Sequence, residues 1–128
     1  MKTEFLGKTV SGPFTIPSGI VSTAPSIIQR IFDDLPEIGV ITTKSVGPVP
    51  RAGNREPVYS QYAPGCFVNA VGLTNPGAEE ARKGFESLTI PEDRFLLVST
   101  FGGNIDEFGE VAKILSPVAD GLELTLSC

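Results

Sequence analysis

Apolar residues recur along this chain in two alternating patterns, short apolar runs and stripes at helical spacing. The runs predict strands at residues 14–16, 40–45, 95–100 and 121–128. The stripes predict helices at residues 27–35, 78–88 and 105–115. Strands that alternate with helices in this order are typical of a parallel sheet with right-handed crossovers.

Turn and cap residues indicate where these elements begin and end. A hairpin is expected over residues 5–15, with its turn at Ser11-Gly12-Pro13. Thr23 is expected to cap the first helix, and Asn104 with Glu107 three residues later resembles a capping box. The side chains expected to face the core are Ile27, Ile28, Ile31, Phe32 and Leu35 in the first helix and Ile105, Phe108, Val111, Ala112 and Leu115 in the third.

One segment interrupts the repeating pattern. Residues 47–67 form a long insertion rich in proline and glycine, and Cys66 and Phe67 at its end have the pattern of a hairpin. Long loops inside compact domains are usually functional. We therefore expect this insertion to serve a binding site.

The last run indicates which kind of parallel sheet this is. Residues 121–128 place three leucines on one face and Glu123, Thr125 and Ser127 on the other. A polar inner face suits the interior of a barrel near its active end. A closed barrel needs roughly 250 residues. The expected fold is therefore α/β, the amino-terminal half of a TIM (β/α)8 barrel.

Residues 1–128 would then form a single partial domain with about four parallel strands, without its carboxyl-terminal half. A complete small doubly wound domain is the alternative fold. Such domains normally end in a covering helix, whereas this chain ends on a strand pattern.

Composition narrows the chemistry. The chain has a formal net charge of −5 and no histidine, which excludes histidine-based catalytic pairs and histidine-ligated zinc. The acidic excess disfavours nucleic acid as a partner. The sequence shows neither a signal-peptide core nor an apolar run of membrane-spanning length, so a cytoplasmic location is expected. Two cysteines are too few for a disulfide scaffold, and no role is assigned to Cys66.

Ligands of parallel α/β sheets gather at the carboxyl ends of the strands. An ammonium at the tip of a strand of Val, Ile and Thr has no folding reason, so Lys44 could stabilise anionic charge or reach solvent from the rim. Cys128 could be a base, a nucleophile or an inert buried thiol. Asn69 could present its amide to a planar heterocycle or cap a turn.

Five motifs follow one another along the chain. They are Pro17-Ser18-Gly19, Thr43-Lys44-Ser45, Pro50-Arg51-x-Gly53-Asn54-x-x-Pro57, Asn69-Ala70-Val71-Gly72-Leu73-Thr74-Asn75-Pro76-Gly77 and Glu123-Leu124-Thr125-Leu126-Ser127-Cys128. In order and spacing they resemble the amino-terminal half of the class 1 dihydroorotate dehydrogenases. The fourth motif is similar to the branch that works with an iron–sulfur and FAD subunit and uses NAD.

This resemblance implies an FMN-containing barrel that oxidises dihydroorotate to orotate in pyrimidine biosynthesis. From the residues themselves, no metal site is expected. Cys128 corresponds to the base that removes a proton from the ring carbon while hydride passes to the flavin. The residues that match flavin contacts are Ser18, Gly19, Lys44, Ser45, Ser99 and Thr125. Those that match contacts to the pyrimidine are Lys44, Asn69, Ala70, Val71, Gly72 and Leu73.

Two positions depart from the family pattern. The family usually has Asn where Thr125 stands and often Asn near Ser99, and a hydroxyl lacks the fixed donor and acceptor of an amide. A related dihydropyrimidine is therefore an open alternative as substrate.

The family takes its phosphate contacts to FMN from later strands, so residues 1–128 alone are expected to be inactive. The expected partners are the carboxyl-terminal half of the barrel, an electron-transfer subunit and a second copy of the chain. A non-catalytic half-barrel that self-associates through its strand edges, and a small α/β domain that binds an anionic metabolite, are the other open functions.

Overall fold

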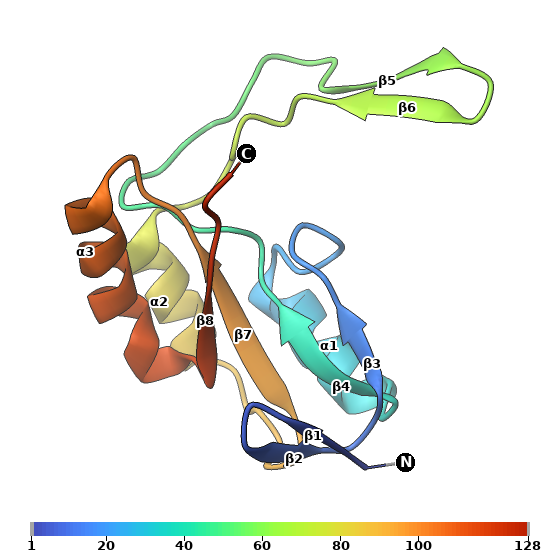
Figure 1. The fold of residues 1–128 in the computed structure, drawn as a ribbon, viewed down its shortest axis with the longest axis vertical. Coiled ribbons are helices and arrows are strands. Elements are labelled where there is room, and N and C mark those ends of the chain that lie inside the picture. The colour runs from blue at the N-terminus through green and yellow to red at the C-terminus, as the bar shows by residue number, and fades with distance from the viewer. Residues whose placement is uncertain (1, 128) are drawn as a thin grey trace.

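A four-stranded parallel sheet organises the computed structural model, which describes residues 2–127 (Figure 1). The sheet order is β3-β4-β7-β8, with the strands at Phe14–Ile16, Ile38–Thr42, Phe95–Thr100 and Gly121–Leu124. All three strand pairs are parallel. The predicted α/β class and parallel sheet are confirmed. The strands predicted at 40–45 and 121–128 end earlier, at Thr42 and Leu124.

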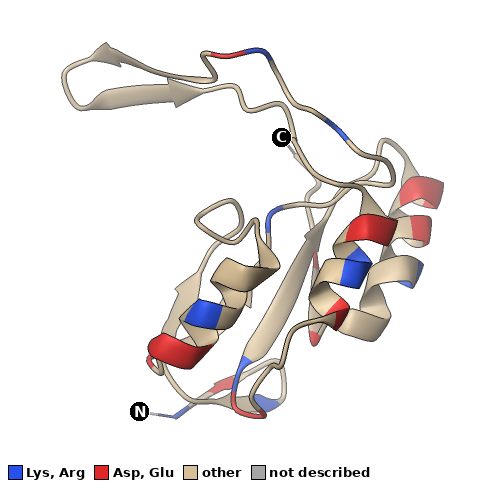
Figure 2. Cartoon of the chain, turned by 180° about the vertical axis from the view of Figure 1, so that it is seen from behind, with Lys and Arg blue, Asp and Glu red and all other residues tan. Residues whose placement is uncertain are grey.

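Helices cover one face of this sheet (Figures 1 and 2). They are α1 (Pro25–Asp34), α2 (Ala78–Glu86) and α3 (Ile105–Leu115), followed by a 3-10 turn, η1 (Ser116–Val118). Between helices and sheet lies the main core, formed by Ile28, Ile31, Phe32, Ile41, Val46, Ala78, Ala81, Phe85, Leu96, Val98, Val111 and Leu115. The near-continuous apolar sequence of β4 and β7 is explained by their central position in the sheet.

The predicted apolar stripes include more residues than the helices actually bury. Helix α1 buries three of its five stripe residues, while Ile27 and Leu35 remain 43% and 45% exposed. Helix α3 buries Val111 and Leu115, and Ile105 at its first position is 84% exposed. The prediction that Ile27, Leu35 and Ile105 face the core is therefore wrong. A helix packed on a sheet buries only the side chains on the narrow face that points at the sheet, and only along part of its length.

The two predicted helix caps differ in outcome. Helix α1 has Ala24 at its N-cap, with Pro25 following and no side-chain cap, so the prediction for Thr23 is wrong. In α3 the Asn104 side chain accepts the Glu107 backbone N–H (3.0 Å), as expected. The Glu107 carboxylate accepts the backbone N–H of Gly103 (2.8 Å) rather than that of Asn104.

The first hairpin lies earlier than predicted. Strands β1 (Thr3–Phe5) and β2 (Lys8–Val10) are antiparallel and turn at Leu6-Gly7, not at Ser11-Gly12-Pro13. Leu6 and Gly7 have φ angles of 47° and 81°, the left-handed conformation that two-residue hairpin turns favour. Gly12 instead lies against the backbone of Glu37, where the chain passes from the hairpin to β3.

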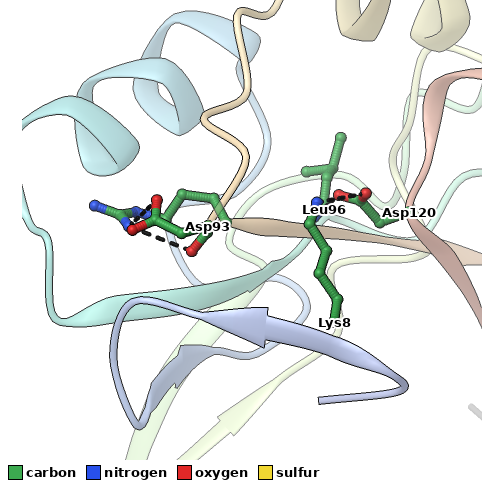
Figure 3. Close-up of polar contacts among 5 residues, drawn as sticks. Lys8, Asp93, Leu96 and Asp120 are labelled. Atoms are coloured by element: carbon green, nitrogen blue, oxygen red, sulfur yellow. Dashed lines mark hydrogen bonds and ion pairs between the residues drawn. The ribbon is translucent and has the colours of Figure 1, made fainter. Parts of the chain in front are cut away.

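An ion pair fastens this hairpin to the amino end of the sheet (Figure 3). The Lys8 ammonium lies 2.8 Å from the Asp120 carboxylate. The other oxygen of Asp120 accepts the backbone N–H of Leu96 (2.8 Å). The hairpin therefore lies at the end opposite to the carboxyl ends of the strands (Figure 1).

A second hairpin occupies the predicted insertion. Strands β5 (Tyr59–Ala63) and β6 (Cys66–Asn69) are antiparallel and form an arm that projects beyond the carboxyl end of the sheet (Figure 1). The arm carries no charged residue (Figure 2). The hairpin pattern at Cys66 and Phe67 is confirmed. No helix within residues 2–127 has the length and apolar character that crossing a bilayer requires.

Candidate functional site

Four hydroxyl groups meet at the carboxyl end of the sheet, one from each of its strands or the segment that follows. The Ser45 Oγ lies 2.9 Å from Ser99 Oγ, 3.3 Å from Thr125 Oγ1 and 3.3 Å from Ser18 Oγ. Ser99 Oγ lies 3.2 Å from Thr125 Oγ1. We call Ser18, Ser45, Ser99 and Thr125 the hydroxyl cluster. All four were expected from the sequence, and the structure brings them together.

Strand periodicity places the cluster on the face away from the helices. Val98 belongs to the core beneath the helices, and its partner Leu122 packs against the same core. Because successive residues of a strand point to opposite faces, Ser99 points the other way. Ser99 is fully buried, and its backbone N–H donates to the Thr43 hydroxyl (3.1 Å). Strand β7 thus also carries a polar residue, the buried Ser99, on the face where the last strand was expected to be polar.

Gly19 and Lys44 lie beside one another next to this cluster. Gly19 has a φ of 82°, and the Lys44 Cδ lies 3.9 Å from the position that a Cβ on Gly19 would occupy. The Lys44 backbone N–H donates to the Ser22 carbonyl (3.1 Å). Among the residues that the structure describes, no carboxylate forms an ion pair with Lys44. Its positive charge is therefore available to a ligand.

The loop after β6 is held by a residue that the sequence analysis did not single out, Asn54. Its side-chain amide donates to the Ala70 carbonyl (2.7 Å), and its backbone N–H donates to the Val71 carbonyl (3.0 Å). Gly72 and Leu73 have φ angles of 82° and 55°. Gly72 packs so closely on Asn54 that a Cβ added to Gly72 would lie 2.7 Å from the backbone nitrogen of Asn54. The signal for this role was present in the third motif, where Asn54 follows a glycine.

Asn75 is a second positioning residue, to which the sequence analysis assigned no role. It is 7% exposed. Its Oδ1 accepts the backbone N–H groups of Gly47 (3.1 Å) and Gly77 (2.9 Å), and its Nδ2 donates to the Leu73 carbonyl (2.8 Å). One buried amide therefore joins the start of the insertion, the loop and the start of α2.

The remaining predicted residues are spread over the arm and the chain end. Asn69 is the last residue of β6 and is exposed on the arm. Ala70 follows it and donates its N–H to the Val58 carbonyl (2.7 Å). Cys128 lies outside the described residues. Within residues 2–127, no group of three or more potential metal ligands occurs.

Parallel strands with helices on one face and polar residues at the carboxyl ends of the strands are the features of part of a β/α barrel. The family model described as dihydroorotate dehydrogenase matches residues 1–128. The chain belongs to the dihydroorotate dehydrogenase family.

Curated relatives agree with this assignment. The chain is 37% identical over 128 residues to "Dihydroorotate dehydrogenase B (NAD(+)), catalytic subunit" of Pyrococcus furiosus, covering 100% of this chain and 41% of that protein. The protein of the same name from Methanocaldococcus jannaschii is 34% identical over 131 residues, with 100% and 42% coverage. The chain thus spans about two-fifths of the length of the relatives it matches.

A solved structure supports the fold. The ligand-free dihydroorotate dehydrogenase of Eimeria tenella superposes with a TM-score of 0.77 at 20% identity, over 98% of this chain and 38% of that one. The described elements therefore match part of a dihydroorotate dehydrogenase TIM barrel, as predicted.

Proposed function

We propose that this chain provides the amino-terminal part of an FMN-dependent barrel that oxidises dihydroorotate to orotate. The observation that carries the proposal is the hydroxyl cluster, in which residues from four separate strands or their ends meet at the carboxyl end of the sheet. Residues 1–128 would be a partial domain, completed by later strands of the barrel.

The residues present fit a flavin. Hydroxyls both donate and accept hydrogen bonds, which matches the mixed nitrogen and carbonyl edge of a flavin ring. Gly19 has no side chain and open space around its Cβ position, apart from Lys44, so a planar ring could approach its backbone. When bound, FMN would accept the hydride.

The flavin contacts in this proposal are Ser18, Gly19, Lys44, Ser45 and Thr125. Ser99, expected from the sequence to touch the flavin, is fully buried and would position the Ser45 and Thr125 hydroxyls instead. The Lys44 ammonium would stabilise negative charge on the flavin and on the pyrimidine. The loop residues Asn69, Ala70, Val71, Gly72 and Leu73 would bind the pyrimidine, and their backbone is ordered by Asn54 and Asn75. Cys128 would take the proton from the ring carbon.

A related dihydropyrimidine is a second candidate substrate, favoured by the contacts of Thr125. Its hydroxyl lies 3.2 Å from Ser99 and 3.3 Å from Ser45. Because these contacts engage its one hydroxyl, Thr125 offers a ligand fewer hydrogen-bonding groups than the amide of an asparagine would. A substrate with fewer polar substituents than dihydroorotate would need fewer contacts there.

Partners follow from the relatives. The curated relatives are described as catalytic subunits of an NAD(+) enzyme. We infer that an electron-transfer subunit would carry electrons away from the flavin. Dimerisation through the open strand edges is the competing function for residues 1–128.

The test is a flavin titration of the polypeptide that contains these residues together with the later barrel strands. We expect a flavin absorbance band that bleaches when dihydroorotate is added without an electron acceptor. Bleaching by dihydrouracil alone would favour the second substrate. A polypeptide that stays colourless with excess FMN would contradict the proposal.

Variants make the test specific to the cluster. Ser99→Ala is expected to weaken FMN binding by about tenfold, equivalent to roughly 1.4 kcal/mol. Ser60→Ala, which removes an exposed hydroxyl on β5, is the matched control and should leave FMN binding unchanged.

A further inference from the structure

Three residues other than glycine have a left-handed backbone in the part of the chain that the structure describes. They are Leu6, Val21 and Leu73, with φ angles of 47°, 51° and 55°. Leu6 lies in a two-residue hairpin turn, which favours this conformation. Val21 and Leu73 lie in the two loops of the proposed site, two residues after Gly19 and directly after Gly72. Backbone strain is typically concentrated in this way at ligand sites.

Val21 is the residue that fits this conformation least well, because its side chain is branched at Cβ. A β-branched residue with a positive φ is a genuine outlier, and the conformation opposes folding. The Val21 side chain is 56% exposed, so its burial offsets little of this strain. The surrounding chain must therefore impose the conformation.

A tight turn lies directly before this residue. The Ile20 backbone N–H donates to the Pro17 carbonyl (3.3 Å), and the φ of 82° at Gly19, the third residue of the turn, is typical of a type II turn. The Ser18 hydroxyl comes from the same turn and belongs to the hydroxyl cluster. The turn therefore carries two of the proposed flavin contacts, Ser18 and Gly19.

A buried residue fixes the chain on the other side of Val21. Ser22 is 1% exposed, and its carbonyl accepts the Lys44 backbone N–H (3.1 Å). Val21 is thus the single residue that connects the turn to a fixed point at the carboxyl end of the sheet. A negative φ at Val21 would redirect the turn relative to Ser22, and would move Gly19 away from the Lys44 side chain that it now lies beside.

We propose that Val21 is a positioning residue of the flavin site, because its strained conformation holds the turn in the orientation that binds the flavin. Valine has only a small left-handed region available, so the turn is held in one orientation. Glycine would adopt the same φ without strain, but it would also populate other conformations. The protein is therefore less stable than it could be, and its site is preformed. This inference rests on the proposed function.

The experiment compares Val21→Gly with the wild type in the polypeptide that also contains the later barrel strands. Without flavin, we expect the melting temperature to rise by a few degrees, because the strain is lost. The Kd for FMN, measured by flavin titration, should rise roughly fivefold, because the turn then occupies the binding conformation for only part of the time. A substitution that merely damages the fold would lower both stability and affinity.

Val49→Gly is the matched control. Val49 is 61% exposed and its φ is not positive, so this valine is not strained. Its replacement should lower the melting temperature, since glycine loses more backbone entropy on folding, and should leave the Kd for FMN within twofold.

Val21→Asn separates the backbone from the valine side chain. Asparagine tolerates the left-handed region better than valine and is less mobile than glycine. This variant should therefore lie between the wild type and Val21→Gly in both melting temperature and Kd for FMN. Weaker FMN binding than that of Val21→Gly would mean that the valine side chain itself contacts the flavin, and would contradict a positioning role.

The two measurements distinguish failure of this inference from failure of the proposed function. A fall in the melting temperature of Val21→Gly, or a Kd for FMN within twofold of the wild type, overturns the inference, while FMN binding by the wild type retains the proposed function. Wild-type protein that stays colourless with excess FMN overturns the proposed function and this inference with it.

Discussion

Ser99 illustrates how a single small side chain supports both fold and site. Its buried hydroxyl lies within hydrogen-bond distance of Ser45 and Thr125. Removing it in Ser99→Ala leaves these groups with one partner fewer, and we expect the free energy of unfolding to fall by about 1–2 kcal/mol. Urea denaturation of this variant and of the exposed control Ser60→Ala measures the effect. Equal midpoints for the two variants would show that the cluster adds nothing to stability.

Replacing Asn75 is expected to lower the free energy of unfolding more than replacing Ser99. Its side chain makes three hydrogen bonds from a buried position. Asn75→Ala should lower the free energy of unfolding by roughly 2–3 kcal/mol, since each lost bond contributes about 1 kcal/mol. Denaturant unfolding is the measurement, and the exposed Asn69→Ala is the control for stability. A loss in the free energy of unfolding smaller than that of Asn69→Ala would mean that water replaces the hydrogen bonds of the Asn75 amide.

At the scale of elements, α3 shows how local chemistry defines a helix. The Asn104 side chain satisfies the Glu107 backbone N–H at the helix start. Asn104→Ala should reduce the free energy of unfolding by about 1 kcal/mol. Asn104→Ser should keep most of the stability that the cap contributes, because a serine side chain also caps helices. Thermal unfolding of the two variants distinguishes a capping effect from a general effect of substitution.

The same helix contains a glycine whose replacement should stabilise the protein. Gly109 is exposed inside α3, and a Cβ there meets nothing within 4 Å. Gly109→Ala should raise the free energy of unfolding by about 0.5–1 kcal/mol, because alanine loses less backbone entropy in a helix. Gly84→Ala is the contrast, since its Cβ would lie 2.9 Å from Pro25. A decrease in the Gly109→Ala melting temperature would count against this reading.

At the scale of the whole molecule, the sheet has β3 and β8 at its two edges. Unpaired strand edges are templates for association, and Leu126 just beyond β8 is 83% exposed. Residues 1–128 on their own should therefore sediment with a mass above 13.5 kDa. Leu126→Lys should shift them towards monomer, because a charge at an edge opposes pairing. A monomer at high concentration in sedimentation velocity would contradict the expectation.

Much of the architecture was predictable because it follows from local periodicity. The strand at 95–100 and the start of α2 at Ala78 have the predicted positions. The polar face of the last strand was visible as alternation in the sequence. The predicted hairpin turn at Ser11-Gly12-Pro13 was wrong because turn residues also occur where a chain merely passes close to another backbone. Local composition does not distinguish these two uses.

The amino-acid sequence by itself determined the alternation of strands and helices, the polar character of the strand ends and the motifs shared with the family. Only the tertiary structure decided that Ser45 and Thr125, 80 residues apart, share one cluster. It also decided that Asn75 is buried and that Ile105 is exposed. The reason is physical: periodicity is a property of neighbouring residues, whereas contacts across the sheet depend on strand order and register, which the packing of the whole chain sets.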